Sequence, residues 1–149
     1  MQLSPHFHLS EFTVSQEAAR RGIDNTPPAV LIPRLKLTAQ HLELARTILG
    51  GHPIILTSGY RCDELNTAIN GSRTSAHMRG DAADFICPRF GSPLAICRAL
   101  AVQKDLPFDQ LIEEGTWVHL GFAREGMRPR RQVLTKRPGS GYQTGLAAA

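Results

Sequence analysis

The sequence predicts a single α+β domain, in which N-terminal helices pack on a small, mainly antiparallel sheet. The chain has 149 residues, of which 42% are hydrophobic and 20% charged, so it can bury one core but has no room for a second full domain. Two helix-like patterns come first, and short apolar runs typical of strands follow, with one more helix among them. This order favours an α+β domain over a repeated βαβ unit.

The first helix is expected over residues 11–21. Ser10 is a suitable N-cap, because its side chain can accept a hydrogen bond from a free amide of the first turn. Gly22 supplies the stop, since glycine readily adopts the left-handed conformation found after helices. Residues 24–27, with the sequence Asp-Asn-Thr-Pro, are then expected to form a turn.

A longer second helix is expected between Pro28 and Gly50. Pro33 falls in its first turns, where a missing backbone amide costs least. Apolar side chains recur every three or four positions and predict one buried face. The residues of this face are Leu31, Leu35, Thr38, Leu42, Ala45 and Leu49.

Residues 53–57 form a short apolar run with β-branched side chains and are expected to be a buried strand. They open into a turn at 58–61, and a short helix is expected over 63–69. The polar segment 70–79 has no core periodicity, and polar loops of this kind often carry functional residues.

The second half of the chain predicts three more strands and one helix. Ser92 and Pro93 are a suitable N-cap and first-turn residue for a helix that continues to about residue 102. Residues 114–116 are expected to join the last two strands as a hairpin. The expected strands are 82–86, 108–113 and 117–122.

Residues 126–149 are expected to form a basic tail rich in Pro and Gly, outside a folded domain of residues 1–125. This stretch has no periodic apolar face. The net charge of the whole chain is +4, and much of the excess lies between Arg124 and Arg137. Such a tail can contact any anionic polymer or simply aid solubility, so no nucleic-acid partner is expected.

Cysteine usage and hydropathy argue against a disulfide scaffold and against a membrane-spanning protein. The three cysteines, Cys62, Cys87 and Cys97, cannot all pair within one chain, and we expect them to be small apolar residues of a protein made under reducing conditions. No run of ~18 apolar residues occurs, so no membrane span is expected. Residues 1–12 lack the pattern of a classical export signal.

Three residues of metal-ligand type stand out in the second half of the chain. His77 and Asp84 lie where the polar segment passes into a strand, and His119 lies in a later strand. Two imidazoles and one carboxylate are the ligand set of a catalytic zinc site, which leaves a fourth position for water. Each also has a simpler interpretation, because a single strand histidine is usually structural and an aspartate often caps a turn.

The motif around these residues has the form Ser-x-His-x-x-Gly-x-Ala-x-Asp, and a Trp-x-His element follows it. Both resemble motifs of the zinc D-alanyl-D-alanine carboxypeptidases and their phage relatives, the L-alanyl-D-glutamate peptidases of endolysins. The sequence Ser-Gly-Tyr-Arg at 58–61 is similar to the strand-end signature of that family, and the resemblance extends over residues 7–122. The matching residues are Ser75, His77, Gly80, Ala82, Asp84, Trp117 and His119.

The resemblance implies a zinc ion (Zn2+) held by His77, Asp84 and His119, with Arg61 binding a carboxylate or carbonyl oxygen of the substrate. It implies a peptidase acting on the peptide stems of bacterial peptidoglycan, at either the D-Ala-D-Ala or the L-Ala-D-Glu bond. Residues 7–28 are similar to phage and prophage members, so a role in lysis or cell-wall entry is expected. The protein is then a monomer made in the cytoplasm, which acts at the wall after release or as part of a phage particle.

An alternative is a catalytically silent module that binds the cell wall, because relatives of this fold can lose catalysis. All the reactive residues that the resemblance implies are present, and this argues against that alternative.

The family places the general base, a Glu, shortly before the last His, and this chain has both Glu113 and Glu114 there. If residues 115–116 form a two-residue turn, Ile112 pairs with His119 and Glu114 shares the face of that histidine. A loop of three residues would put Glu113 on that face instead. Family members usually carry the Glu just before the turn, which favours Glu114. Several relatives have it three residues before the last His, a spacing from which this chain departs.

Overall fold

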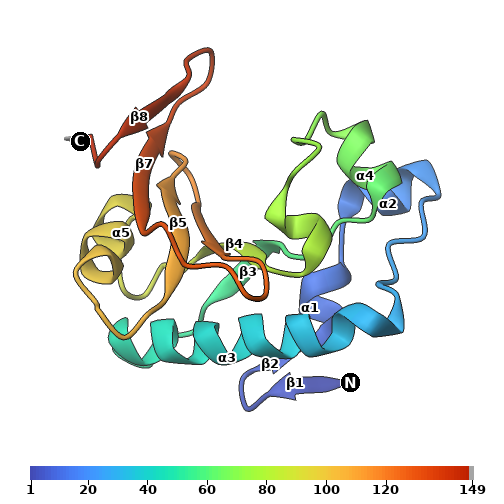
Figure 1. Ribbon diagram of the computed structural model, residues 1–149, viewed down its shortest axis with the longest axis horizontal. Coiled ribbons are helices and arrows are strands. Elements are labelled where there is room, and N and C mark those ends of the chain that lie inside the picture. Colours follow the sequence, from blue (N-terminus) through green and yellow to red (C-terminus); the bar gives the residue numbers. More distant parts are fainter. Residues whose placement is uncertain (148–149) are drawn as a thin grey trace.

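A six-stranded sheet forms the centre of the computed structural model, which describes residues 1–147 (Figure 1). The strand order is β3-β4-β6-β5-β7-β8, in which β5 and β7 are parallel and the other neighbours are antiparallel. The prediction of one α+β domain with a mainly antiparallel sheet is therefore confirmed. The strands are β3 Ile55–Ser58, β4 Ala82–Ile86, β5 Phe108–Glu113, β6 Val118–Phe122, β7 Gln132–Lys136 and β8 Tyr142–Thr144.

The N-terminal region has two short helices where the sequence predicted one. Helix α1, Leu9–Thr13, begins after His8, whose side chain accepts the capping hydrogen bond that was expected of Ser10. Helix α2, Gln16–Arg21, ends at Gly22 as predicted, in the left-handed conformation with φ of 67°.

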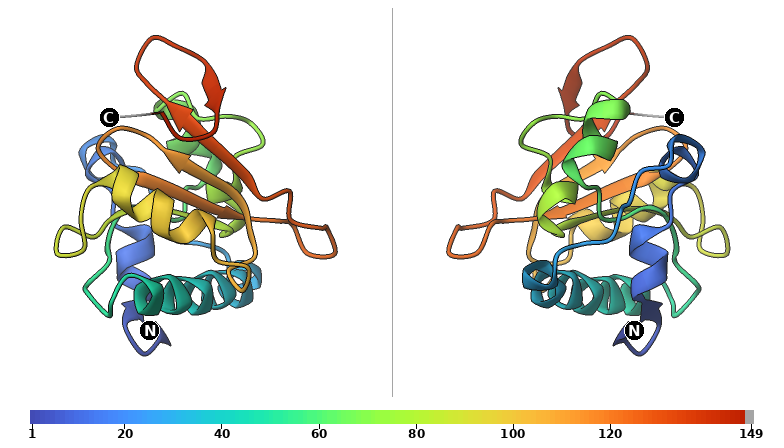
Figure 2. Two further views of the ribbon diagram at one scale, coloured as in Figure 1. Left: turned by 90° about the vertical axis from the view of Figure 1, so that its left-hand side faces the viewer. Right: turned by 90° about the vertical axis from the view of Figure 1, so that its right-hand side faces the viewer.

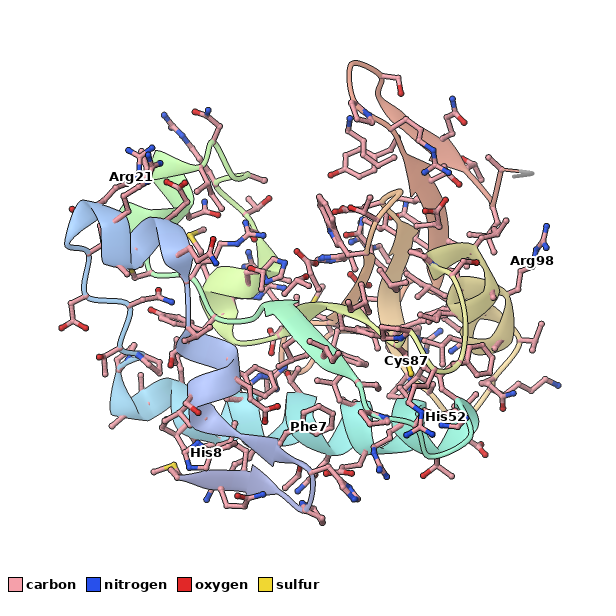
Figure 3. The ribbon with its side chains drawn as sticks, turned by 180° about the vertical axis from the view of Figure 1, so that it is seen from behind. Phe7, His8, Arg21, His52, Cys87 and Arg98 are labelled. Atoms are coloured by element: carbon pink, nitrogen blue, oxygen red, sulfur yellow. The ribbon has the colours of Figure 1, made fainter. Side chains whose placement is uncertain are left out.

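The break between the two helices falls at Val14, whose backbone is extended. Ser15 starts the second helix, because its side chain accepts a hydrogen bond from the amide of Ala18 at 3.1 Å. Phe7 is buried next to Phe12, with ring centroids 6.5 Å apart, and Figure 3 shows it at the level of α3. A two-stranded ribbon, β1 Gln2–Ser4 and β2 Phe7–His8, precedes the helices.

Helix α3, Ile32–Ile48, follows the 3-10 turn η1, Ala29–Leu31, and runs along one side of the sheet (Figure 1). The predicted apolar face is buried except for Leu31, which is partly exposed. The helix ends before Gly50 and Gly51, which both have positive φ. The buried residues of this face are Leu35, Thr38, Ala39, Leu42, Ala45 and Leu49.

The two faces of the sheet have different roles. Ala83, Phe85, Val118 and Leu120 point into the hydrophobic core. Helix α5, Pro93–Ala101, begins after Ser92 as predicted and contributes to the same core. Residues between those core positions point to the opposite face, because side chains alternate along a strand. Neither α3 nor α5 covers that face, because both pack in the core on the other side of the sheet. The face is therefore available for a site.

One further helix and a 3-10 turn lie next to the polar segment that the sequence singled out. Helix α4, Asp63–Ala68, and the 3-10 turn η2, Ala76–Arg79, flank residues 70–75 (Figure 1). No helix within residues 1–147 has the length and apolar character needed to cross a membrane. Cys87 and Cys97 are buried in the core, in agreement with their expected role as small apolar residues.

The segment beyond residue 125 differs from the peripheral tail that the sequence suggested. Strand β7 pairs in parallel with β5, and β8 forms a hairpin with β7. Leu134 and Thr135 are buried in this part of the sheet. Short strands give too few residues for a visible period, so pattern alone could not find them. Residues 148–149 of the expected tail lie outside the described residues.

Candidate metal centre

The three residues expected to be metal ligands lie together in the folded chain. One ligand atom from each of His77, Asp84 and His119 lies within 4.8 Å of the other two. Oδ1 of Asp84 is 3.2 Å from Nε2 of His77 and 2.9 Å from Nδ1 of His119. The two imidazole rings are 5.1 Å apart between centroids and lie at 64° to each other. One carboxylate and two imidazole nitrogens therefore surround one small space.

The register of the sheet places two of these ligands. Asp84 on β4 lies directly opposite His119 on β6. Ser58 on β3 and Ile112 on β5 continue the same row across the sheet. Because side chains at one level of adjacent strands point to the same face, this row points away from the helical core.

The turn η2 supplies the third candidate ligand, His77, and α3 holds this turn in place. Gly80 ends the turn with φ of 74°, a conformation that suits glycine. Its carbonyl accepts a hydrogen bond from Oγ1 of Thr38 at 2.7 Å. Nε of Arg34 donates to Oδ1 of the neighbouring Asp81 at 2.8 Å. Thr38 and Arg34 of α3 thus hold the residues that follow His77 and so fix the position of this candidate ligand.

The hydrogen bonding of His77 fits a metal ligand. Its Nδ1 lies 2.6 Å from the carbonyl oxygen of Gly59, which can only accept, so Nδ1 carries the proton. Nε2 is then an unprotonated acceptor, and it is fully buried without any hydrogen-bond partner among residues 1–147. In metal-bound histidines, one ring nitrogen usually binds the metal while the other donates its proton to a carbonyl or carboxylate oxygen. Nε2 and Nδ1 of His77 are suited to these two roles.

The electrostatics of the cluster also suit a cation. Burial alone would raise the pKa of Asp84, but the two imidazoles beside it lower its pKa well below the usual range. Burial lowers the pKa of His77, so that ring is neutral near pH 7. Burial also acts to lower the pKa of His119, but the hydrogen bond with Asp84 and the negative charges of Asp84 and Glu114 together outweigh burial and raise the pKa. An anionic carboxylate is thus held between the rings, where a metal would take the place of the His119 proton.

Gly121 leaves room for the ring of His119, two residues before it on β6. A Cβ atom at position 121 would lie 3.0 Å from Nε2 of His119. That separation is tighter than ordinary van der Waals contact, so the ring would have to move. The absence of a side chain therefore lets Nδ1 of His119 face Asp84.

We expect Gly121→Ala to weaken divalent metal binding by about tenfold or more, because a displaced ring no longer matches the other two ligands. Competition with a chromophoric chelator measures the affinity. Gly141→Ala is the matched control, since a Cβ there meets no atom within 4 Å and its φ is not positive. Equal affinities for the two variants would contradict the role given to Gly121.

The hairpin between β5 and β6 has the two-residue turn that was one of the two alternatives. The amide of Glu114 donates to the carbonyl of Trp117 at 3.0 Å, and Ile112 lies opposite His119. Glu114 therefore points to the face of His119 and lines the same cleft. Burial raises the pKa of Glu114, and the nearby Asp84 raises it further.

Glu113 points to the other face and has partners there. Its buried side chain forms an ion pair with the half-exposed Arg137 and accepts a hydrogen bond from the amide of Gly115 at 2.6 Å. These contacts hold the turn and the segment after β7 together. Glu113 does not line the cleft that contains His119.

Arg61 lies beside the ligands at the end of β3. Its Nη2 is 3.7 Å from Oδ2 of Asp84. Its Nε donates to Oγ of Ser58 at 3.3 Å, and Nη1 donates to Oδ1 of Asn66 at 3.2 Å. Burial lowers the pKa of Arg61, while Asp84 and Glu114 act in the opposite direction. The guanidinium is thus held in a fixed orientation at the border of the cleft.

A cleft of about 680 Å³ contains the ligand cluster, with Arg61 and Glu114 in its wall. Residues 70–79 form one side, and the β7–β8 hairpin stands on the other (Figure 1). The C-terminal segment contributes Arg124, Arg128 and Tyr142 to the lining, which the sequence reasoning missed. No motif marks these residues, because only the folding of the supposed tail brings them to the cleft.

The comparisons with known proteins agree with the site. A family model described as Peptidase M15 matches residues 5–121, which include all three clustered residues as well as Arg61 and Glu114. This range agrees with the resemblance recognised from the sequence over residues 7–122. Comparison with curated proteins gave no match.

Proposed function

The chain belongs to the peptidase M15 family, and from this premise we propose that it is a zinc-dependent peptidase that hydrolyses peptide stems of bacterial peptidoglycan. The observation that carries the proposal is the cluster of His77, Asp84 and His119, in which a buried Nε2 has no partner among the described residues. Two imidazoles and one carboxylate suit zinc and leave a coordination position for water.

The chain's own groups supply the rest of the chemistry. When bound, zinc would lower the pKa of a water molecule to about 7 and polarise the carbonyl of the peptide bond. Glu114 takes a proton from the attacking water and passes it to the leaving amine. Its raised pKa makes it a stronger base than an exposed glutamate, and its place on the face of His119 brings it to the reacting atoms.

Arg61 binds the substrate in this proposal. Its contacts with Ser58 and Asn66 fix the orientation of the guanidinium, so little conformational entropy is lost when it binds a substrate oxygen. A carboxylate or carbonyl of the peptide is the matching group. The role of Arg61 is therefore to position the scissile bond above the cluster.

Two bonds of the peptide stem fit the family resemblance, D-Ala-D-Ala and L-Ala-D-Glu. Digestion of purified peptidoglycan followed by mass spectrometry separates them. Release of free D-alanine identifies a carboxypeptidase, whereas fragments with a new glutamate amino terminus identify an endopeptidase. A phage or prophage origin, with action at the wall after lysis or within a phage particle, is part of the same proposal. It is supported by the likeness of residues 7–28 to phage members.

We expect the purified protein to bind about one zinc ion per chain and to lose both metal and peptidase activity on treatment with a chelator. His119→Ala should lower the zinc content strongly, because it removes one of three ligands. Glu114→Gln should keep the zinc, since Glu114 is outside the cluster. Elemental analysis by mass spectrometry measures the metal in each variant.

Two results would contradict the proposal. Metal-free protein that still cuts peptidoglycan would exclude a role for zinc. Zinc-loaded protein that binds peptidoglycan sacculi but releases no fragment would identify a silent wall-binding module instead.

A further inference from the structure

One wall of the cleft comes from a loop that lies beyond the family match. This loop, residues 123–131, joins β6 to β7, and Figure 2 shows it projecting from the body of the molecule. We call it the basic loop. Arg124, Met127 and Arg128 of this loop line the cleft. Its contribution therefore adds to the site that the family motif defines.

The basic loop is anchored at both ends. At its start, Nη2 of Arg34 donates to the carbonyl of Ala123 at 3.0 Å. At its end, Arg130 forms a two-pronged ion pair with Asp109 on β5, with contacts of 3.1 Å and 2.7 Å. A bidentate pair of this kind also fixes orientation. The loop between these anchors is thus held beside the cleft.

A second set of contacts strengthens the end of the loop. The guanidinium of Arg131 lies 4.2 Å from the ring centroid of Phe108 and donates to the carbonyls of Leu106 and Gln103. Arg130 and Arg131 are therefore used to hold the loop. The side chains of Arg124 and Arg128 make no comparable contact within the described part of the chain.

The charges along this wall are unbalanced. Arg124 and Arg128 are exposed and form no ion pair within residues 1–147. Nearby, Arg34 and Arg79 share the single carboxylate of Asp81. The carboxylates Asp84 and Glu114 line another part of the cleft, at the ligand cluster. The cleft therefore has carboxylates at the ligand cluster and cations along the basic loop, so it favours a ligand with negative charge away from the reacting bond.

We propose that Arg124 and Arg128 form a carboxylate-binding subsite, which holds a free side-branch carboxylate of the peptide substrate away from the bond that is cut. This inference rests on the proposed peptidase function. The cleft volume of about 680 Å³ is large enough for more of the substrate than the scissile bond. Guanidinium groups match carboxylates in shape and charge, and Arg124 and Arg128 both line the cleft.

The test compares two synthetic stem peptides. One has all its side-branch carboxyl groups free, and the other has them converted to carboxamides, with the same C-terminus in both. We expect the wild-type protein to cleave the first with a kcat/KM about tenfold higher or more, mainly through KM, because the subsite binds ground state and transition state alike. The double variant Arg124→Gln/Arg128→Gln should lose this preference.

The control is Arg89→Gln/Arg98→Gln, which changes the net charge equally at two exposed positions that do not line the cleft. Figure 3 shows Arg98 projecting outward from α5. The control should keep the preference for the free carboxylates. If both double variants lose the preference, the preference depends on net charge alone, and the proposed subsite is wrong.

The outcomes separate the subsite from the peptidase function. If wild-type protein cuts both peptides equally, or if Arg124→Gln/Arg128→Gln keeps the preference, the subsite is wrong and the peptidase function stands. If zinc-loaded wild-type protein cuts neither peptide nor whole peptidoglycan, the proposed function fails and the subsite fails with it. Binding of duplex DNA that is lost in this variant, without any effect on cleavage, would assign the arginines to another ligand.

Discussion

Glu114→Gln is expected to give a folded, zinc-loaded protein whose peptidase activity is lower by ~10²–10⁴-fold, the usual cost of losing a general base. The amide cannot take a proton from water, yet it has nearly the same shape as the carboxylate. Glu114 lines the cleft and lies outside the ligand cluster, so neither folding nor metal content should change much. Rates on purified peptidoglycan, normalised to bound zinc, measure the effect.

Glu113→Gln is the matched control, because the two side chains are neighbours of the same type on opposite faces of β5 and its turn. Its ion pair with Arg137 is buried on the glutamate side, so the variant should be less stable by ~1–3 kcal/mol. Activity per folded molecule should be nearly unchanged. A dead Glu113→Gln with an active Glu114→Gln would mean that the two roles are exchanged and that the hairpin register is wrong.

The choice between these glutamates shows how far sequence reasoning can reach. Strand pairing has a strict period of two, so a turn length fixes which side chain shares the face of His119. The sequence limited the turn to two possible lengths, and the observed pairing of Ile112 with His119 selected the shorter one. The ligand cluster itself was accessible because its residues occur at characteristic spacings in a recognisable motif.

Other features depend on contacts that no local pattern encodes. The break at Val14 arises because Ser15 caps a new helix, whereas the sequence offered Ser10 as an equally good cap. Strand β7 is stabilised by pairing with β5, which lies far from it in the sequence. The last residue of β5, Glu113, is also the buried partner of Arg137, which follows β7. Such long-range pairing overrides weak local propensity.

The basic loop and Tyr142 were missed for the same reason. These residues line the cleft only because of the fold, and a run of arginines in a stretch rich in Pro and Gly resembles a solvated tail. Tyr142 lies on β8, and Glu114 and Asp84 are close enough to contribute to the rise of its pKa, after the larger effect of burial. The hairpin thus approaches the reactive groups although it lies beyond the family match.

The second large effect is expected for Arg61→Ala, which should lower kcat/KM by about two orders of magnitude or more. The reason is that a guanidinium fixed beside the ligands is removed from where it would bind a substrate oxygen. The structure also predicts a modest loss of stability. Oδ1 of Asn66, a residue that is 4% exposed, would lose the hydrogen bond from Nη1, at a cost of roughly 1–3 kcal/mol.

Activity and stability must therefore be measured separately to assign the role of Arg61. Asn66→Ala is the control, because it removes the same hydrogen bond from the other side, together with the one that Nδ2 of Asn66 donates to the carbonyl of Ser72. The guanidinium stays in the cleft, where its Nε still donates to Ser58. Both variants should have a lower Tm, but only Arg61→Ala should lose most of its activity per zinc-loaded molecule. Added guanidine should restore part of that activity if the missing group contacts substrate. Equal activity in the two variants, with no rescue, would reduce Arg61 to a residue that only supports the fold.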